Sequence, residues 1–156
     1  MFLTVHSTAG LLIAEQTNQI WLAFGLGFLS HFLLDMIPHG DNTLVKEKFK
    51  FSDNEVKLLK KLAGADALIM GIILLILYLT GHIPDIWLAA WAVAGTILPD
   101  FLQGIYVLTK TKLLEKYFSV HWNLHYALKG LTVPFKTGMI IQLMFLTVFL
   151  TLLIIN

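Results

Sequence analysis

Long apolar runs separated by short polar segments dominate the hydrophobic pattern of this chain. Four of these runs reach the roughly 20 residues that a helix needs to cross the hydrocarbon core of a bilayer. They cover approximately Asn18–Pro38, Lys61–Gly81, Pro84–Leu108 and Phe135–Asn156. The pattern therefore predicts an all-α integral membrane bundle with about four transmembrane helices.

Two further helices are predicted outside these runs. Residues 1–16 are too few to span, and their apolar stretch at 9–14 favours a short re-entrant or interfacial helix packed against the others. Residues 113–128 alternate apolar and polar positions at helical spacing, which predicts a histidine-bearing helix on the cytoplasmic side. We expect all of these helices to form one domain over residues 1–156, with no cleavable signal.

The connection between the first two runs differs from the rest of the chain. Residues 43–60 mix lysines with aromatic and aliphatic side chains, which favours a strap lying on the membrane surface. We expect Ser52 or Asp53 to cap the helix that follows.

Composition agrees with a membrane protein and removes several kinds of chemistry. Of the 156 residues 57% are hydrophobic and 13% charged, whereas a soluble domain carries about 25% charged residues. The absence of cysteine excludes disulfides, thiolate metal sites and cysteine nucleophiles. All eleven basic residues are lysines, so no guanidinium can clamp a phosphate. The net charge of +1 gives no support to nucleic-acid binding.

The lysines are distributed on one side of the predicted topology. They fall within residues 46–61 and 110–136, and the other connection and both ends of the chain have none. The positive-inside rule then places the first and third connections in the cytoplasm. We therefore expect His82 and the C-terminus on the opposite face of a prokaryotic inner membrane.

The segment that ends the first apolar run contains the densest candidate site. His31, Asp35, His39 and Asp41 lie within it, and all are residue types that ligate metals and are costly to bury unpaired. His31 and Asp35 are four residues apart and share one helix face. Pro38 closes the helix, so the two residues after it turn back toward its end. The pattern predicts a metal site at a membrane surface.

Three aspartates lie inside predicted spans at matching depth. At a rise of about 1.5 Å per residue, Asp35, Asp66 and Asp100 lie about 22–24 Å from the outer ends of their helices. Because these helices alternate in direction, all three aspartates reach the cytoplasmic edge of the hydrocarbon core. Asp66 is either a ligand or a residue that orients a histidine.

Five of the six histidines can meet the same plane. His39, His121 and His125 belong to cytoplasmic connections, and His6 joins them if the first helix enters from that face. The late pair is four residues apart on one helical face, which suits two imidazoles on one ion. A hydrogen bond from His6 to the backbone is the alternative for that residue.

Together these features resemble a known family. An early histidine, the block HxxxDxxPHxD beginning at His31, an internal aspartate, an LPD tripeptide and a late histidine pair are similar to the YdjM-type group of small prokaryotic membrane proteins. That group is described as predicted membrane-bound metal-dependent hydrolases, and it is distantly similar to zinc-dependent phospholipases C. The likeness runs from His6 to His125. It implies one metal-binding cleft lined by His6, His31, Asp35, His39, Asp41, Asp66, Asp100, His121 and His125.

The chain departs from the family pattern at its late block. Family members often carry an arginine after the first histidine of the pair and a serine after the second, where this chain has Trp122 and Tyr126.

The donor types set the expected chemistry. Histidine and carboxylate ligands favour Zn²⁺, with Mn²⁺ or Fe²⁺ as alternatives, and nine candidates exceed the needs of one tetrahedral ion, so we expect two or more. Such a site would hydrolyse a phosphoester of a phospholipid or lipid-linked phosphate, with membrane lipids as partners. Asp41 or Asp100 would accept the proton of the attacking water.

Two other functions stay open. One is a metal-binding membrane protein, a transporter or sensor, without hydrolytic activity. The other is a scaffold whose polar cluster only joins helices.

Overall fold

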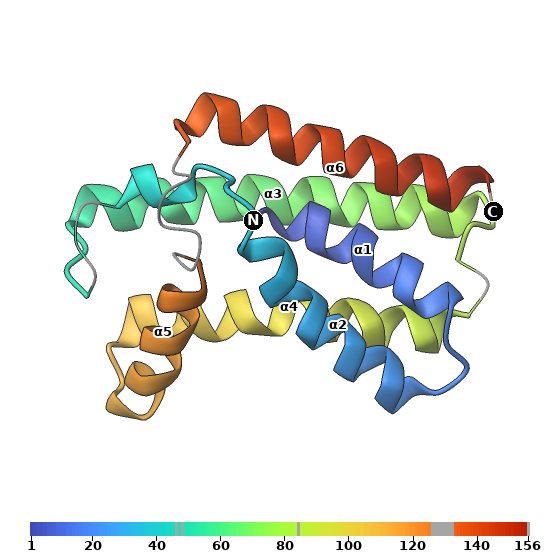
Figure 1. The fold of residues 1–156 in the computed structure, drawn as a ribbon, viewed down its shortest axis with the longest axis horizontal. Coiled ribbons are helices and arrows are strands. Elements are labelled where there is room, and N and C mark those ends of the chain that lie inside the picture. The colour runs from blue at the N-terminus through green and yellow to red at the C-terminus, as the bar shows by residue number, and fades with distance from the viewer. Residues whose placement is uncertain (46, 48, 84, 126–132, 156) are drawn as a thin grey trace.

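The computed structural model describes residues 1–45, 47, 49–83, 85–125 and 133–155. Within these residues the chain is helical, which confirms the predicted all-α class (Figure 1). The elements are α1 (Leu3–Glu15), α2 (Ile20–Asp35), the 3-10 helix η1 (Asp41–Leu44), α3 (Asp53–Leu79), α4 (Ile86–Thr109), α5 (Lys112–His125) and α6 (Phe135–Ile155).

Three helices, α3, α4 and α6, are long and apolar enough to cross a membrane. The fourth predicted span is the 16-residue helix α2, which is shorter than its apolar run. It ends at Asp35 because Pro38 disfavours helical backbone in the residue before it. The predicted N-terminal helix is α1, and the predicted histidine-bearing helix is α5.

The first half of α3 replaces part of the predicted surface strap. Residues 53–60 belong to this helix, which begins directly after Ser52. The Ser52 hydroxyl accepts a hydrogen bond from the Glu55 amide at 3.3 Å, and the Glu55 carboxylate accepts one from the Ser52 amide at 2.8 Å. This reciprocal capping box fixes the start of the helix and confirms Ser52 as its cap.

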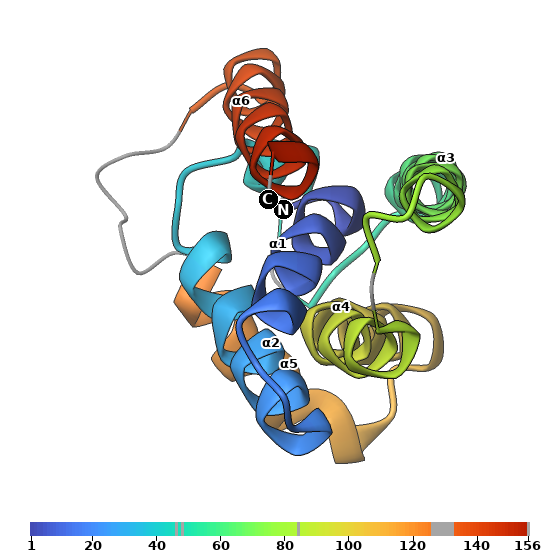
Figure 2. The ribbon, with the colours of Figure 1, turned by 90° about the vertical axis from the view of Figure 1, so that its right-hand side faces the viewer.

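The shortest of the described α-helices, α1, lies at the centre of the bundle. It contacts α2, α3, α4 and α6, which surround it in Figure 2. Its buried hydroxyls are satisfied inside the helix: Ser7 donates to the Thr4 carbonyl at 3.0 Å, and Thr8 donates to the Val5 carbonyl at 2.9 Å. These internal hydrogen bonds allow a polar helix to be buried among apolar ones.

Glycines bring α2 and α4 close together. A side chain at Gly27 would clash with the carbonyl of Ala92, and one at Gly95 would clash with the carbonyl of Phe24. Close backbone approach of this kind is the usual way in which membrane helices pack. It places the middle of α2 against the first half of α4, and the candidate ligands His31, Asp35 and Asp100 follow farther along these two helices.

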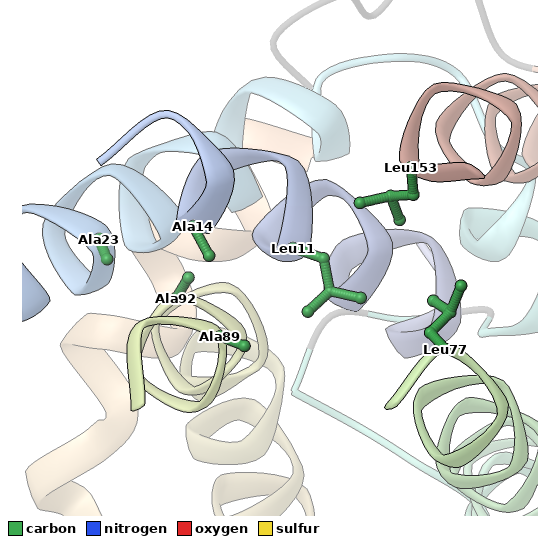
Figure 3. Close-up of a cluster of buried hydrophobic side chains, with 7 residues drawn as sticks. All are labelled: Leu11, Ala14, Ala23, Leu77, Ala89, Ala92 and Leu153. Carbon is green, nitrogen blue, oxygen red and sulfur yellow. The ribbon is translucent and has the colours of Figure 1, made fainter. Parts of the chain in front are cut away.

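The apolar core occupies one end of the bundle. It is formed where α1, α3 and α6 end and α2 and α4 begin, by Leu11, Ala14, Ala23, Leu77, Ala89, Ala92 and Leu153 (Figure 3). The buried residues His6, His31, Asp35 and Asp66 lie toward the other end of α1, α2 and α3, and the buried His121 lies on α5, which contributes no residue to this core.

Candidate metal centre

Asp35, the last residue of α2, is the centre of the polar cluster. Its side chain is buried, and its Oδ2 atom lies 2.9 Å from His31 Nε2, 3.2 Å from His121 Nε2 and 2.8 Å from His125 Nε2. Its other oxygen lies 3.1 Å from His6 Nε2. One carboxylate is thus surrounded by four imidazoles that come from α1, α2 and α5.

The imidazole nitrogens also approach one another. The Nε2 atom of His121 lies 3.3 Å from that of His31 and 3.1 Å from that of His125. Two ring nitrogens at such a distance need a proton or a cation between them. Ligands of one tetrahedral zinc ion, with bonds of about 2.0–2.1 Å, lie about 3.3 Å apart. The spacing of this cluster therefore fits a coordination sphere.

Backbone carbonyls fix the outward-facing nitrogen of two histidines. The Nδ1–H of His31 donates to the Thr96 carbonyl at 2.7 Å, and the Nδ1–H of His39 donates to the Ile37 carbonyl at 2.6 Å. A carbonyl only accepts, so Nδ1 carries the proton in both rings. In the neutral ring the lone pair is then on Nε2, which faces the cluster as a metal ligand requires.

Two groups of side chains bring ligand atoms within 4.8 Å of one another in the described residues. The first is His31, Asp35, Asp100 and His121, and the second is Asp35, His39 and His125. In the first, Asp100 Oδ1 lies 3.8 Å from His31 Nε2 and 3.9 Å from His121 Nε2. These separations are too long for hydrogen bonds but suit ligands arranged around an ion.

The second group has further polar neighbours. Asp41 Oδ2 lies 3.4 Å from His39 Nε2, and the amino group of Met1 lies 3.0 Å from the same nitrogen and 2.5 Å from Asp35 Oδ1.

Burial, with this ammonium group nearby, lowers the pKa of His39 to about 4. Burial also lowers the pKa of His121. Both rings are therefore neutral near pH 7, as ligands must be.

Two predicted metal residues, His6 and Asp66, lie outside both groups. The Asp66 carboxylate accepts hydrogen bonds from the Leu3 amide at 2.5 Å and the Thr4 amide at 3.2 Å, so it caps the N-terminus of α1. The His6 ring stacks on His31 at 4.2 Å, and its Nδ1 atom is buried without a partner in the described residues. We include neither in the proposed ligand set.

Sequence reasoning did not assign a role to Gln142, although it is the main polar residue of the last apolar run. Its side chain accepts from the Phe2 amide at 2.7 Å and donates to the His39 carbonyl at 3.2 Å. One turn earlier, Gly138 leaves no room for a side chain beside that carbonyl. Helix α6 therefore holds both the His39 loop and the start of α1 in place.

Tyr117 on α5 is a second residue that the sequence did not single out. Its hydroxyl donates to the Pro99 carbonyl at 2.9 Å and lies 3.3 Å from His121 Nδ1. The phenol thus touches the residue before Asp100 and one of the histidines of the cluster.

No family model, curated protein or solved structure matches this chain. The class of protein is therefore defined by the fold and the cluster: an all-helical chain with three helices of membrane-spanning length and buried His/Asp groups that could hold metal ions. The resemblance to the YdjM-type family stays a prediction.

Proposed function

We propose that this protein is a membrane-embedded, metal-dependent hydrolase of lipid-borne phosphoesters. The observation that carries the proposal is the convergence of three imidazole Nε2 atoms, from His31, His121 and His125, on the buried carboxylate of Asp35. In the hydrogen bonds and ion pairs of the described residues, the Met1 ammonium group pairs with Asp35 but reaches none of these three nitrogens. A divalent cation between them would accept the lone pairs of all three.

We infer two ion positions that share Asp35. The first would be held by His31, Asp35, Asp100 and His121, and the second by Asp35, His39 and His125. Imidazole and carboxylate donors without sulfur favour Zn²⁺, and Mn²⁺ or Fe²⁺ suit the same set. Two-metal sites are common in phosphatases and nucleases, where the ions stabilise the attacking and leaving oxygens.

Bound ions would lower the pKa of a bound water and neutralise a phosphoryl oxygen. The chain contains no arginine that could neutralise that oxygen instead. Asp41 is the proposed base. Its side chain is partly exposed, and its Oδ1 atom has no hydrogen-bond partner among the described residues. When the water oxygen bonds to phosphorus, its proton passes to Asp41. The bond from phosphorus to the lipid alcohol breaks, and the departing alkoxide takes that proton.

The position of the cluster supports a lipid substrate. Helices α3, α4 and α6 expose apolar side chains such as Leu68, Phe101 and Ile140, as lipid-facing surfaces do. From Ile86 to Asp100 the helix rises about 21 Å, about two-thirds of a hydrocarbon core roughly 30 Å thick. A phosphoester entering sideways from the nearer leaflet would reach this level.

The lysine distribution gives the proposed orientation. Lysines 57, 60 and 61 precede Asp66 on α3, on the side away from the apolar core, and Lys110 and Lys112 follow Asp100, directly after α4 and at the start of α5. The positive-inside rule assigns this end to the cytoplasmic face of a prokaryotic inner membrane.

A metal transporter fits the fold less well. Transport across the bundle requires polar groups along the whole path. The end away from the cluster is filled instead by the apolar core around Leu11, Leu77 and Leu153. A protein that binds metal without turnover is the other alternative, and measuring turnover of the metal-loaded protein distinguishes it from a hydrolase.

The test uses the full chain purified in detergent without chelator, with its affinity tag at the C-terminus because Met1 contacts the cluster. After loading with Zn²⁺ or Mn²⁺, the protein is offered phosphatidic acid and phosphatidylglycerol in mixed micelles, with p-nitrophenyl phosphate as a soluble comparison. We expect lipid turnover that a chelator abolishes and added metal restores. We also expect Asp35→Asn to lower turnover by several orders of magnitude.

His82→Ala is the matched control, because His82 lies at the other end of the bundle and hydrogen-bonds Thr80. It should retain the wild-type rate. Metal-loaded protein that binds ions but releases no product from either lipid would contradict the hydrolase and leave a metal-binding role.

A further inference from the structure

Tyr117 lies one helical turn before His121 on α5, at the contact between α5 and α4. Its ring meets the His121 ring edge-on at 5.8 Å, and its hydroxyl lies between His121 Nδ1 and the Pro99 carbonyl. Pro99 directly precedes Asp100, so the phenol joins the two elements that carry Asp100 and His121, two members of the first ion position.

We propose that Tyr117 is a positioning residue that fixes His121 in the tautomer able to bind a metal ion. The inference rests on the proposed metal site, since it assigns a partner to one of that site's ligands. Tyr117 itself touches no other member of either ion position in the hydrogen bonds described above.

The direction of the hydrogen bonds follows from counting protons. A phenol has one hydrogen, and a carbonyl can only accept, so the 2.9 Å contact uses that hydrogen to bond Pro99. The phenol oxygen then offers a lone pair to His121, whose Nδ1 must carry the proton. The 3.3 Å separation is slightly longer than the usual N–H···O range of about 2.7–3.2 Å. The lone pair of His121 is thereby left on Nε2.

This bond opposes a competing tautomer. Asp35 Oδ2 lies 3.2 Å from His121 Nε2, and without a metal ion the carboxylate favours a proton on that nitrogen. A ring protonated at Nε2 has no lone pair there and cannot ligate. The phenol oxygen favours the opposite tautomer, just as the Thr96 carbonyl does for His31. Loss of such a supporting partner typically costs 10–100-fold in metal affinity.

Tyr117→Phe removes the oxygen and keeps the ring, so it isolates the hydrogen bond from the packing. The matched control is Tyr106→Phe, which removes another phenol at the α4–α5 contact, where Tyr106 stacks on Phe118 at 4.4 Å. Each variant is loaded with Zn²⁺ against a competing chelator and, separately, with Co²⁺ to record its visible absorption spectrum.

We expect Tyr117→Phe to weaken Zn²⁺ binding at one of the two positions by about 10–100-fold and to change the Co²⁺ spectrum. Tyr106→Phe should leave both unchanged. Equal loss in both variants, or wild-type affinity in Tyr117→Phe, would overturn the proposal while the metal site stands. If wild-type protein binds neither Zn²⁺ nor Co²⁺, the metal site itself is wrong, and this inference is wrong with it.

A second measurement is made on the wild-type protein and uses a variant only to assign one signal. Protein labelled with ¹⁵N at histidine gives ring nitrogen shifts that report the tautomer, and His121→Gln identifies the signal. In metal-free wild-type protein we expect the His121 proton on Nδ1. A proton on Nε2 would contradict the proposal directly.

Discussion

The two ends of this bundle are built by opposite means. At one end Leu11, Leu77, Leu153 and four alanines pack against one another without polar groups. At the other end α2 buries Asp35, and α2 and α5 bring three imidazole nitrogens against it, next to the His39 loop. The apolar end is stabilised by packing, whereas the polar end buries acceptors, of which the Met1 ammonium group reaches only Asp35, Asp41 and His39 in the described residues. This difference favours the polar end as the candidate metal site and the core as its support.

The largest expected effect is on the stability of the polar end when metal is removed. A ligand present at about 1,000 times its dissociation constant stabilises the folded state by about 4 kcal/mol, so a chelator should remove a stabilisation of that order. Hydrogen exchange, followed by mass spectrometry, should speed up in α5 and near His39 and stay slow around Leu11. If removal of metal speeds up hydrogen exchange equally at both ends, metal does not stabilise the polar end selectively, and the comparison fails.

The second effect concerns the apolar end. Leu153→Ala removes a fully buried side chain of the core, and a large-to-small change of this kind costs about 2–5 kcal/mol. Thermal unfolding in detergent should register this loss, and elemental analysis should find the same number of metal ions per chain as in wild type. A variant that loses metal along with stability would show that the two ends are coupled.

A smaller effect is expected at the start of α1, beside the polar end. Asp66→Asn keeps the shape of the cap on α1 but weakens its charge-assisted hydrogen bonds to Leu3 and Thr4. Loss of a helix cap costs about 1 kcal/mol. Because Asp66 lies outside both ligand groups, Zn²⁺ affinity should change less than twofold. A loss of bound metal in this variant would show that Asp66 is a metal ligand after all.

The sequence predicted the existence of the membrane-spanning helices better than the residues at which the helices begin and end. Apolar length alone identified α3, α4 and α6, because a span is a one-dimensional property of the chain. It overestimated the length of α2, whose end depends on Pro38 rather than on hydropathy. The start of α3 was predicted from the Ser52 or Asp53 cap and not from the apolar run, which begins only at Lys61.

The same limit applies to the candidate site. The matching depth of Asp35, Asp66 and Asp100 indicated a common level, but depth does not say which way a side chain points around its helix. Asp66 therefore points to the start of α1 instead of the cluster. Tyr117 and Gln142 could not be assigned from the sequence because their roles depend on contacts between α5 and α4, and between α6 and the His39 loop.

The central claim is that the cluster around Asp35 holds metal ions. Anomalous diffraction at the zinc edge, from crystals of the zinc-loaded full chain, tests it most directly. We expect a peak about 2.0–2.2 Å from an oxygen of Asp35 and from Nε2 of His31 and His121. Strong density at these three side chains, joined only to one another and with no anomalous peak between them, would contradict it.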